Sequence, residues 1–231
     1  MPQQNVRHEQ SAFSVVILGD FNPAIFHPLW FAQQGLIASE EVEAVSDLET
    51  NENVSRFLLN DVHFQVERHR FGLTTKNPAR AIFLRDLAVG AFTVLEYTPL
   101  NAVGLNKDMV FSMGGLGSWH GVGDCFAPKQ PWQGILESPG MLNVTMGGKR
   151  AECSADSVIV SIRPFMGIDN GVLVAVNQQY NLKTTDTIST AQRNSRALQI
   201  LSEDWTPFLA FAEDSAVTLL ANTTAREGCA S

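Results

Sequence analysis

The sequence predicts an α+β protein, in which a curved and mainly antiparallel sheet carries helices packed on one face. Segments with the two-residue period of strands follow one another without an intervening helix, at residues 54–75 and again at 141–179, and such neighbours usually pair as hairpins. A segment with a helical stripe follows each group, at residues 78–97 and from residue 189, and this grouping of strands and helices is typical of α+β folds. Because 231 residues with 45% hydrophobic side chains can bury a large core, we expect one domain over residues 1–231.

In the first half, the sequence FSVVILG at residues 13–19 predicts a strand that is covered on both faces. Residues 54–67 predict one long strand that places Val62, Phe64 and Val66 on one side and polar residues on the other. The sequence RFGLTT follows the polar residues ERHR, which indicates that it returns as the second strand of a hairpin.

Three helices are predicted between these strands and the middle of the chain. Pro28 opens a short helix that ends at Gly35, and a second helix begins at Ser39, which can cap it. The strongest helical pattern covers residues 78–97, where Asn77 is the expected cap. Gly90 lies in the middle of that helix at a cost of about 1 kcal/mol relative to alanine, which suggests that another element passes close to it.

The second half is expected to repeat this order. A strand at residues 100–113 is followed by a loop or short helix, by three strands near 141–148, 157–164 and 171–179, and by a C-terminal helix that breaks or kinks at Pro207. The element order suggests two similar β-α-β-β-α halves, residues 11–98 and 99–223, although the halves share no residue-level identity.

Composition excludes several classes of function. The net charge is −8 and the 16 Lys and Arg residues are scattered, which argues against nucleic-acid binding, since phosphate contacts need clustered cations. No secretory signal or membrane-spanning apolar run is present, so we expect a cytoplasmic protein without a membrane partner. The three cysteines, Cys125, Cys153 and Cys229, form no C-x-x-C pair, which predicts reduced thiols and no structural metal.

The glycine-rich stretch from Gly114 to Phe126 is the segment that most resembles an active-site loop. It contains Ser118, His120 and Asp124, but no regular strand or helix lets one histidine contact both the serine and the aspartate. The pattern also fails the G-x-S-x-G elbow. We therefore assign no catalytic residue, favour a structural glycine-rich loop, and keep as the alternative a small-molecule or hydrolase site at the loop from Gly114 to Asp124.

In that alternative, the polar neighbours Asn106 or Lys107 would come from the preceding strand. Other chemical patterns are weaker: His63 and His69 lack the spacing of metal ligands, Cys125 beside Phe126 is typical of a buried apolar residue, and the sequence GGKR at residues 147–150 lacks the frame of a phosphate-binding loop. The sequence therefore predicts no cofactor and no metal.

An aromatic segment, residues 21–31, contains four aromatic rings and two prolines. Such rings either close the end of a core or form an anchor for a partner, because aromatic residues dominate interface hot spots. In the second interpretation the interface residues are Phe26, Trp30 and Phe31.

Several segments together resemble a family of uncharacterised, sporadically distributed bacterial proteins: NPAIFHPLWFAQQGLI, RFGLTT, LRDLAVGAFTVLEYTPLNAVGLN, WHGVGDCFAPKQPW, PGMLNVTM and GVLVAVNQQYNL. The resemblance covers residues 13–220 and implies a bacterial, soluble α+β protein, with no reaction, cofactor or site residue to carry over.

These observations favour a non-enzymatic protein-interaction or assembly component of a bacterial cytoplasmic system, whose partner is another protein or a second copy of the chain. The alternatives are the small-molecule site described above and a nucleic-acid clamp, because two repeated halves can build a saddle.

Overall fold

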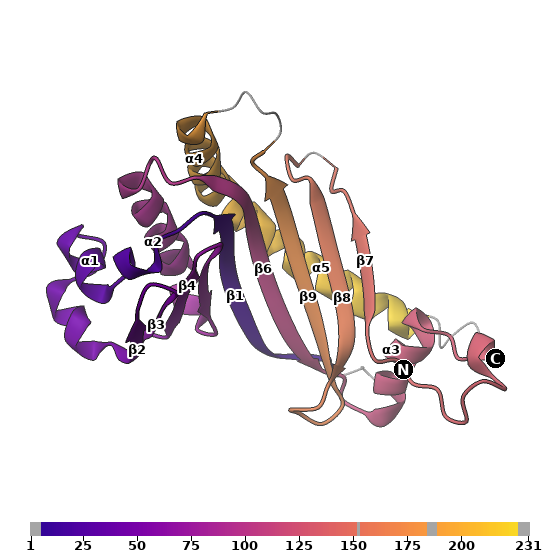
Figure 1. Cartoon of the computed structure of the whole chain (residues 1–231). Coiled ribbons are helices and arrows are strands. Elements are labelled where there is room, and N and C mark those ends of the chain that lie inside the picture. Colours follow the sequence, from indigo (N-terminus) through magenta and orange to yellow (C-terminus); the bar gives the residue numbers. More distant parts are fainter. Residues whose placement is uncertain (1–5, 152, 184–188, 226–231) are drawn as a thin grey trace.

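A computed structural model of the chain describes residues 6–151, 153–183 and 189–225. Its strands form one nine-stranded antiparallel sheet in the order β2-β3-β4-β5-β1-β6-β9-β8-β7 (Figure 1). The sheet is curved and not closed, so the predicted α+β class is confirmed.

The first half supplies five strands and the helices around them. The strands are β1 (Arg7–Gly19), β2 (Ser46–Thr50), β3 (Val54–Leu59), β4 (Val62–Glu67) and β5 (Arg70–Thr75). The helices are α1 (Pro28–Gln33) and α2 (Ala81–Val94), with 3₁₀ turns η1 (Pro23–Ile25), η2 (Ser39–Ala44) and η3 (Pro78–Arg80).

The second half supplies four strands and a longer helical C-terminal part. The strands are β6 (Leu100–Ser112), β7 (Val144–Gly148), β8 (Ser157–Phe165) and β9 (Gly171–Asn181). The helical segments are α3 (Leu116–Phe126), the 3₁₀ turn η4 (Gln130–Trp132), α4 (Thr190–Gln199), the π-helical turn η5 (Ile200–Asp204) and α5 (Trp205–Ala225).

The strand order is symmetrical about the central pair β1 and β6. On one side of this pair lie β5, β4 and β3, and on the other side lie β9, β8 and β7, in matching sequence order; β2 extends the first side beyond β3 and has no counterpart among the described strands. Because β1 and β6 are antiparallel, the two halves are related by an approximate two-fold rotation in topology.

The helices cover one face of the sheet. Helix α2 packs on β1 and β5, and α5 packs on β6 and β9; Figure 1 shows α5 running behind β9, β8 and β7. Alternate residues of β1, such as Val15 and Ile17, are fully buried under this layer. The residues between them point to the other face, which the described helices leave uncovered.

Residues 54–67 form a hairpin and not the single strand that their composition predicted. Asn60 and Asp61 both have positive φ, 48° and 65°, as the two central residues of a type I′ hairpin turn require. Buried positions change phase across this turn, from Leu59 on β3 to Val62 on β4. The predicted hairpin between β4 and β5 is confirmed.

Helix α2 follows its predicted start. The Asn77 side chain accepts a hydrogen bond from the Ala79 backbone at 3.1 Å, and Pro78 opens the 3₁₀ turn that leads into the helix. The close approach expected at Gly90 is present, because a Cβ atom there would collide with Cδ2 of Leu36.

The C-terminal helical segment is continuous through Pro207. Ser189 and Gln192 form a reciprocal capping box at the start of α4. The π-helical turn η5 then precedes α5, and Pro207 falls in the first turn of α5. A wider turn relieves the clash between a proline ring and the preceding carbonyls, so the expected break is replaced by a change of helical pitch.

Within the described ranges, no helix combines the length and apolar character needed to cross a membrane. Cys229 lies outside the described residues.

Candidate functional site

The edge strand β7 leaves its outer backbone groups open. It pairs in regular register with β8 from Val144 opposite Ile162 to Gly148 opposite Val158, and it is the last strand in the sheet order. Its sequence, VTMGG, carries no charge and no proline. Charged side chains and prolines are what natural proteins usually place on an edge strand to prevent its pairing with another chain, and β7 has neither.

An apolar groove runs beside this edge on the helix-covered side of the sheet. Val144 and Met146 of β7 form one wall, and Phe211 and Leu219 of α5 form the other, around a volume of about 470 Å³. Asp214 is the ionisable residue among the described side chains that line the groove, and no cation in the described part of the chain lies within ion-pair distance of it.

The segment that leads into β7 exposes an unusual number of large apolar side chains. Between residues 132 and 146, Leu142 is 88% exposed and Met146 is 69% exposed, and the others are Trp132, Ile135 and Leu136. Exposed apolar residues scattered singly need no explanation, but a concentration in one segment is typical of an interaction site.

The opposite edge of the sheet is protected. Strand β2 has an irregular register with β3 between Ser46 and Glu49, and Asp47 between them has a φ of 54°. A bulge and acidic side chains are common means of preventing edge-to-edge pairing.

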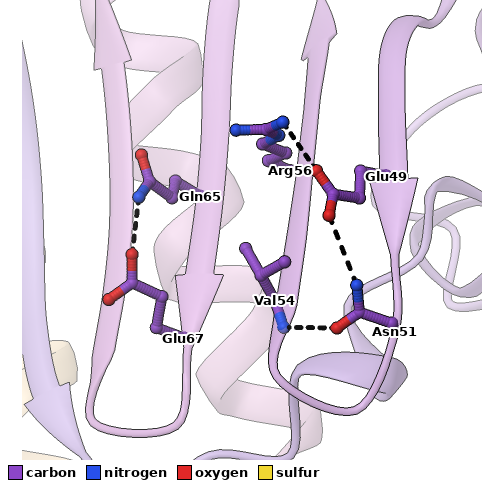
Figure 2. Close-up of polar contacts among 6 residues, drawn as sticks. All are labelled: Glu49, Asn51, Val54, Arg56, Gln65 and Glu67. Carbon is purple, nitrogen blue, oxygen red and sulfur yellow. Dashed lines mark hydrogen bonds and ion pairs between the residues drawn. The ribbon is translucent and has the colours of Figure 1, made fainter.

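Figure 2 shows how the polar side chains near this edge are already paired with one another. Glu49 contacts Arg56 at 2.7 Å and accepts a hydrogen bond from Asn51 at 3.4 Å. Asn51 also accepts a hydrogen bond from the Val54 backbone at 3.0 Å. On β4, Gln65 donates to Glu67 at 2.6 Å. These polar side chains therefore have partners within the protein.

The uncovered face of the sheet is polar at its centre. Asn106 of β6 accepts a hydrogen bond from Asn177 of β9 and lies 3.4 Å from the Ser14 carbonyl. These residues border a shallow cavity of about 350 Å³. Nearby on β6, burial raises the pKa of the Asp108 carboxyl, and the charge of Arg163 partly opposes this shift.

The glycine-rich stretch is the helix α3 and not a loop. Gly114 turns the chain with a φ of 70°, a conformation that only glycine adopts at little cost. The helix is held by tertiary contacts, because Val122 is buried in the core and the Trp119 indole donates to the Gly171 carbonyl at 2.9 Å. These contacts override the weak helix propensity of the glycines.

The structure does not assemble Ser118, His120 and Asp124 into one site. Asp124 pairs with Lys129 at 2.8 Å, and His120 lies against the Trp119 ring at 5.0 Å. Within the described residues, no hydrogen bond joins the three side chains. Only His120 lines the adjacent cavity of about 470 Å³.

Asn106 is separated from α3, since it lies six residues before the end of β6, or about 20 Å along the strand. It belongs to the open face of the sheet and not to the mouth of the α3 cavity.

The aromatic residues that could form an interface are mostly core residues, which corrects that interpretation. Phe26 and Phe31 are buried, and the Phe31 ring packs edge-on against Phe64 at 5.3 Å. Only Trp30 keeps a partly exposed ring, which packs at 5.8 Å from Phe26. The Phe26 and Phe31 rings pack against Phe57, Phe64 and Phe71, which lie on β3, β4 and β5.

In the part of the chain that the structure describes, no group of three or more His, Cys, Asp or Glu side chains could hold a metal ion. Cys125 and Cys153 are free thiols, and Cys153 Sγ lies 4.0 Å from the Tyr180 hydroxyl.

The sequence patterns did not single out β7 and the groove. The residues involved are a short strand and one face of a helix distant from it in sequence, so the only local signal was the uncharged sequence VTMGG after a segment rich in apolar residues.

Comparison with known proteins adds no relative: neither the protein-family models nor the curated proteins give a match to this chain.

Proposed function

We propose that this protein is a non-enzymatic interaction component that binds an extended segment of a partner protein along β7. The segment adds a tenth strand to the sheet, and its alternate side chains enter the groove between β7 and α5. The proposal is carried by the contrast between the two sheet edges, because β2 is bulged and acidic whereas β7 is regular, uncharged and flanked by a groove.

Addition of a partner strand would use both the unpaired backbone of β7 and the apolar groove beside it. Backbone hydrogen bonds to the edge give affinity without regard to sequence, and pockets for every second side chain give specificity. The groove lies on one side of β7 only, so the partner strand needs apolar residues at alternate positions. The residues between them point to the uncovered, polar face of the sheet.

The charge of the groove indicates the chemistry of the partner. Asp214 has no cation beside it among the described residues, and the whole chain carries a net charge of −8. A partner segment with a lysine or arginine next to its apolar positions would complement both the Asp214 carboxylate and the negative net charge of the chain. A second copy of this acidic chain would instead bring like charges together, so we assign the edge to a different protein.

A peptide-binding experiment tests this assignment. A displayed library of ten-residue peptides is selected on the purified protein, and the recovered peptides are labelled for fluorescence anisotropy. We expect apolar residues at every second position and at least one basic residue. Asp214→Asn should weaken the binding of the basic peptides, because it removes the charge that selects them.

The matched variants are Met146→Lys on β7 and Leu48→Lys on β2. Both replace an exposed apolar residue of an edge strand, 69% and 48% exposed respectively. Met146→Lys should lower affinity by about 30-fold, which corresponds to the ~2 kcal/mol contributed by a buried methionine side chain. Leu48→Lys should leave it unchanged.

Equal effects of the two variants would contradict binding at β7. Analytical ultracentrifugation tests whether β7 instead pairs with a second copy of the chain. A concentration-dependent dimer that is absent in Met146→Lys would assign the edge to self-association and refute binding of a partner segment.

A further inference from the structure

A further cavity, called here the arginine cavity, lies between the end of β9 and the first turns of α4. Its volume is about 340 Å³, which falls at the lower end of the range for small-molecule sites. The described side chains around it are Ser154, Asp156, Tyr180, Asn181, Leu182, Gln192, Arg193, Arg196 and Ile200. It shares no residue with the β7 groove.

Two arginines dominate the charge of this cavity. Arg193 and Arg196 are three residues apart on α4 and therefore lie on the same face of the helix. Among the described residues, no carboxylate lies within 4.0 Å of either guanidinium. Arg196 donates a hydrogen bond to the Gln199 side chain at 2.9 Å.

The acidic groups nearby are occupied by other partners. Asp156 accepts a hydrogen bond from the Asn181 backbone at 2.5 Å. Asp204, on the π-helical turn, accepts one from Ser154 at 3.4 Å and faces the Tyr180 hydroxyl. Burial raises the pKa of Tyr180 above its ordinary range, with a further contribution from Asp204, so this hydroxyl stays neutral. The described lining of the cavity therefore holds two basic residues, Arg193 and Arg196, and one acidic residue, Asp156, which lies beyond ion-pair distance of both guanidinium groups.

Arg193 also holds an enclosed donor without an acceptor. Its Nε atom is shielded from solvent and has no hydrogen-bond partner in the described part of the chain. An enclosed N–H that lacks a partner costs about 1–3 kcal/mol. Water does not reach this atom, so the donors that a ligand in the cavity would contact are the remaining N–H groups of the Arg193 guanidinium and those of Arg196. An arginine side chain matches the two oxygens of a carboxylate or phosphate.

We propose that this cavity binds a small molecule through an oxyanion, either a carboxylate or a phosphate, held between Arg193 and Arg196. The Gln192 amide and the Asn181 side chain lie at the rim as further polar contacts. This site is independent of the β7 edge, and its occupancy does not require a partner protein.

Thermal unfolding in the presence of defined anions tests the proposal. The probes are inorganic phosphate and citrate, each compared with sodium chloride at matched ionic strength. We expect at least one of them to raise the Tm of the wild-type protein in a saturable manner, because a ligand that binds only the folded state stabilises it by mass action. A response to phosphate alone or to citrate alone distinguishes the two oxyanions.

Two variants and one control locate the effect. Arg193→Gln should weaken the apparent affinity at least 10-fold. Gln192→Glu keeps the capping box with Ser189, because glutamate is an equally suitable capping residue, but adds a negative charge and should weaken binding similarly without loss of folding. Arg68→Gln, whose exposed side chain lies outside the cavity, should bind as the wild-type protein does.

The assignment is overturned if phosphate and citrate stabilise the wild-type protein no more than chloride does. It is also overturned if Gln192→Glu, correctly folded, binds either anion with unchanged affinity.

Discussion

Removal of Glu213 should destabilise this protein far more than removal of its partner, Lys107. Lys107 lies in the middle of β6, is 1% exposed, and donates to Glu213 on α5. Its ammonium group also lies 5.2 Å from the centre of the Phe13 ring. The Glu213 side chain is 63% exposed. The lysine is therefore the desolvated member of the pair, and it depends on the carboxylate for its charge compensation.

The difference in burial between Lys107 and Glu213 determines how much unfolding free energy each substitution removes. Deleting one partner of a fully buried ion pair costs about 3–5 kcal/mol, because the other charge stays buried alone. Water reaches Glu213, so we expect a value near the lower limit, about 3 kcal/mol, for Glu213→Ala. Lys107→Met removes the buried charge and keeps the volume of the stem, so it should change the free energy of unfolding by less than about 1 kcal/mol.

Urea denaturation monitored by circular dichroism measures these differences. With an m-value of about 3 kcal/mol/M, Glu213→Ala should lower the unfolding midpoint by about 1 M. The double variant should behave like Lys107→Met, because the charge that needed Glu213 is gone. If Lys107→Met costs as much as Glu213→Ala, then the contacts of the ammonium group with Glu213 and the Phe13 ring outweigh its desolvation, and the reasoning from desolvation is refuted.

For two further substitutions, the structure predicts whether the protein becomes more or less stable. Gly90→Ala should destabilise the wild-type protein by about 1 kcal/mol, because the new methyl group meets Leu36. In a Leu36→Ala background the same change should stabilise the protein by about 1 kcal/mol through helix propensity. Chemical denaturation of the four proteins measures both effects, and an effect of the same sign in both backgrounds would contradict the prediction. Asp108 has a pKa that burial raises, so its ionisation opposes folding as the pH rises. Asp108→Asn should therefore be more stable than the wild-type protein at about pH 7 and nearly equal to it at about pH 3, and a difference independent of pH, measured by thermal unfolding, would exclude this explanation.

Local patterns predicted the elements of this fold better than they predicted where those elements end. The cap at Asn77 was predicted correctly, because a cap is a contact between residues two or three positions apart. The cap predicted at Ser39 was wrong, because Ser39 is the first residue of the 3₁₀ turn η2 and Ala38 holds the cap position without a side-chain hydrogen bond. The turn at Asn60 and Asp61 was missed, although the buried positions shift phase there, because the alternation after the turn looked like a continuation of one strand.

The helix α3 shows where local preference fails. Its glycines favour a loop, but the hydrogen bond from Trp119 to Gly171 of β9, the burial of Val122 and the packing of α3 on α5 hold it as a helix. The same limit applies to the candidate sites. The β7 edge depends on the strand order, and the arginine cavity depends on how α4 meets β9. Both are consequences of long-range packing, which no local spacing encodes.

The central pairing of β1 with β6 has a consequence for synthesis of the chain on the ribosome. β1 is the first strand to emerge, but β6 emerges only after β2 to β5 and α2. At about 5–20 residues per second, the nascent chain waits on the order of ten seconds for this partner. During that time one side of β1 is an open edge in the middle of the future sheet. Chains that stop before β6 would keep this edge exposed, and they should aggregate or require a chaperone.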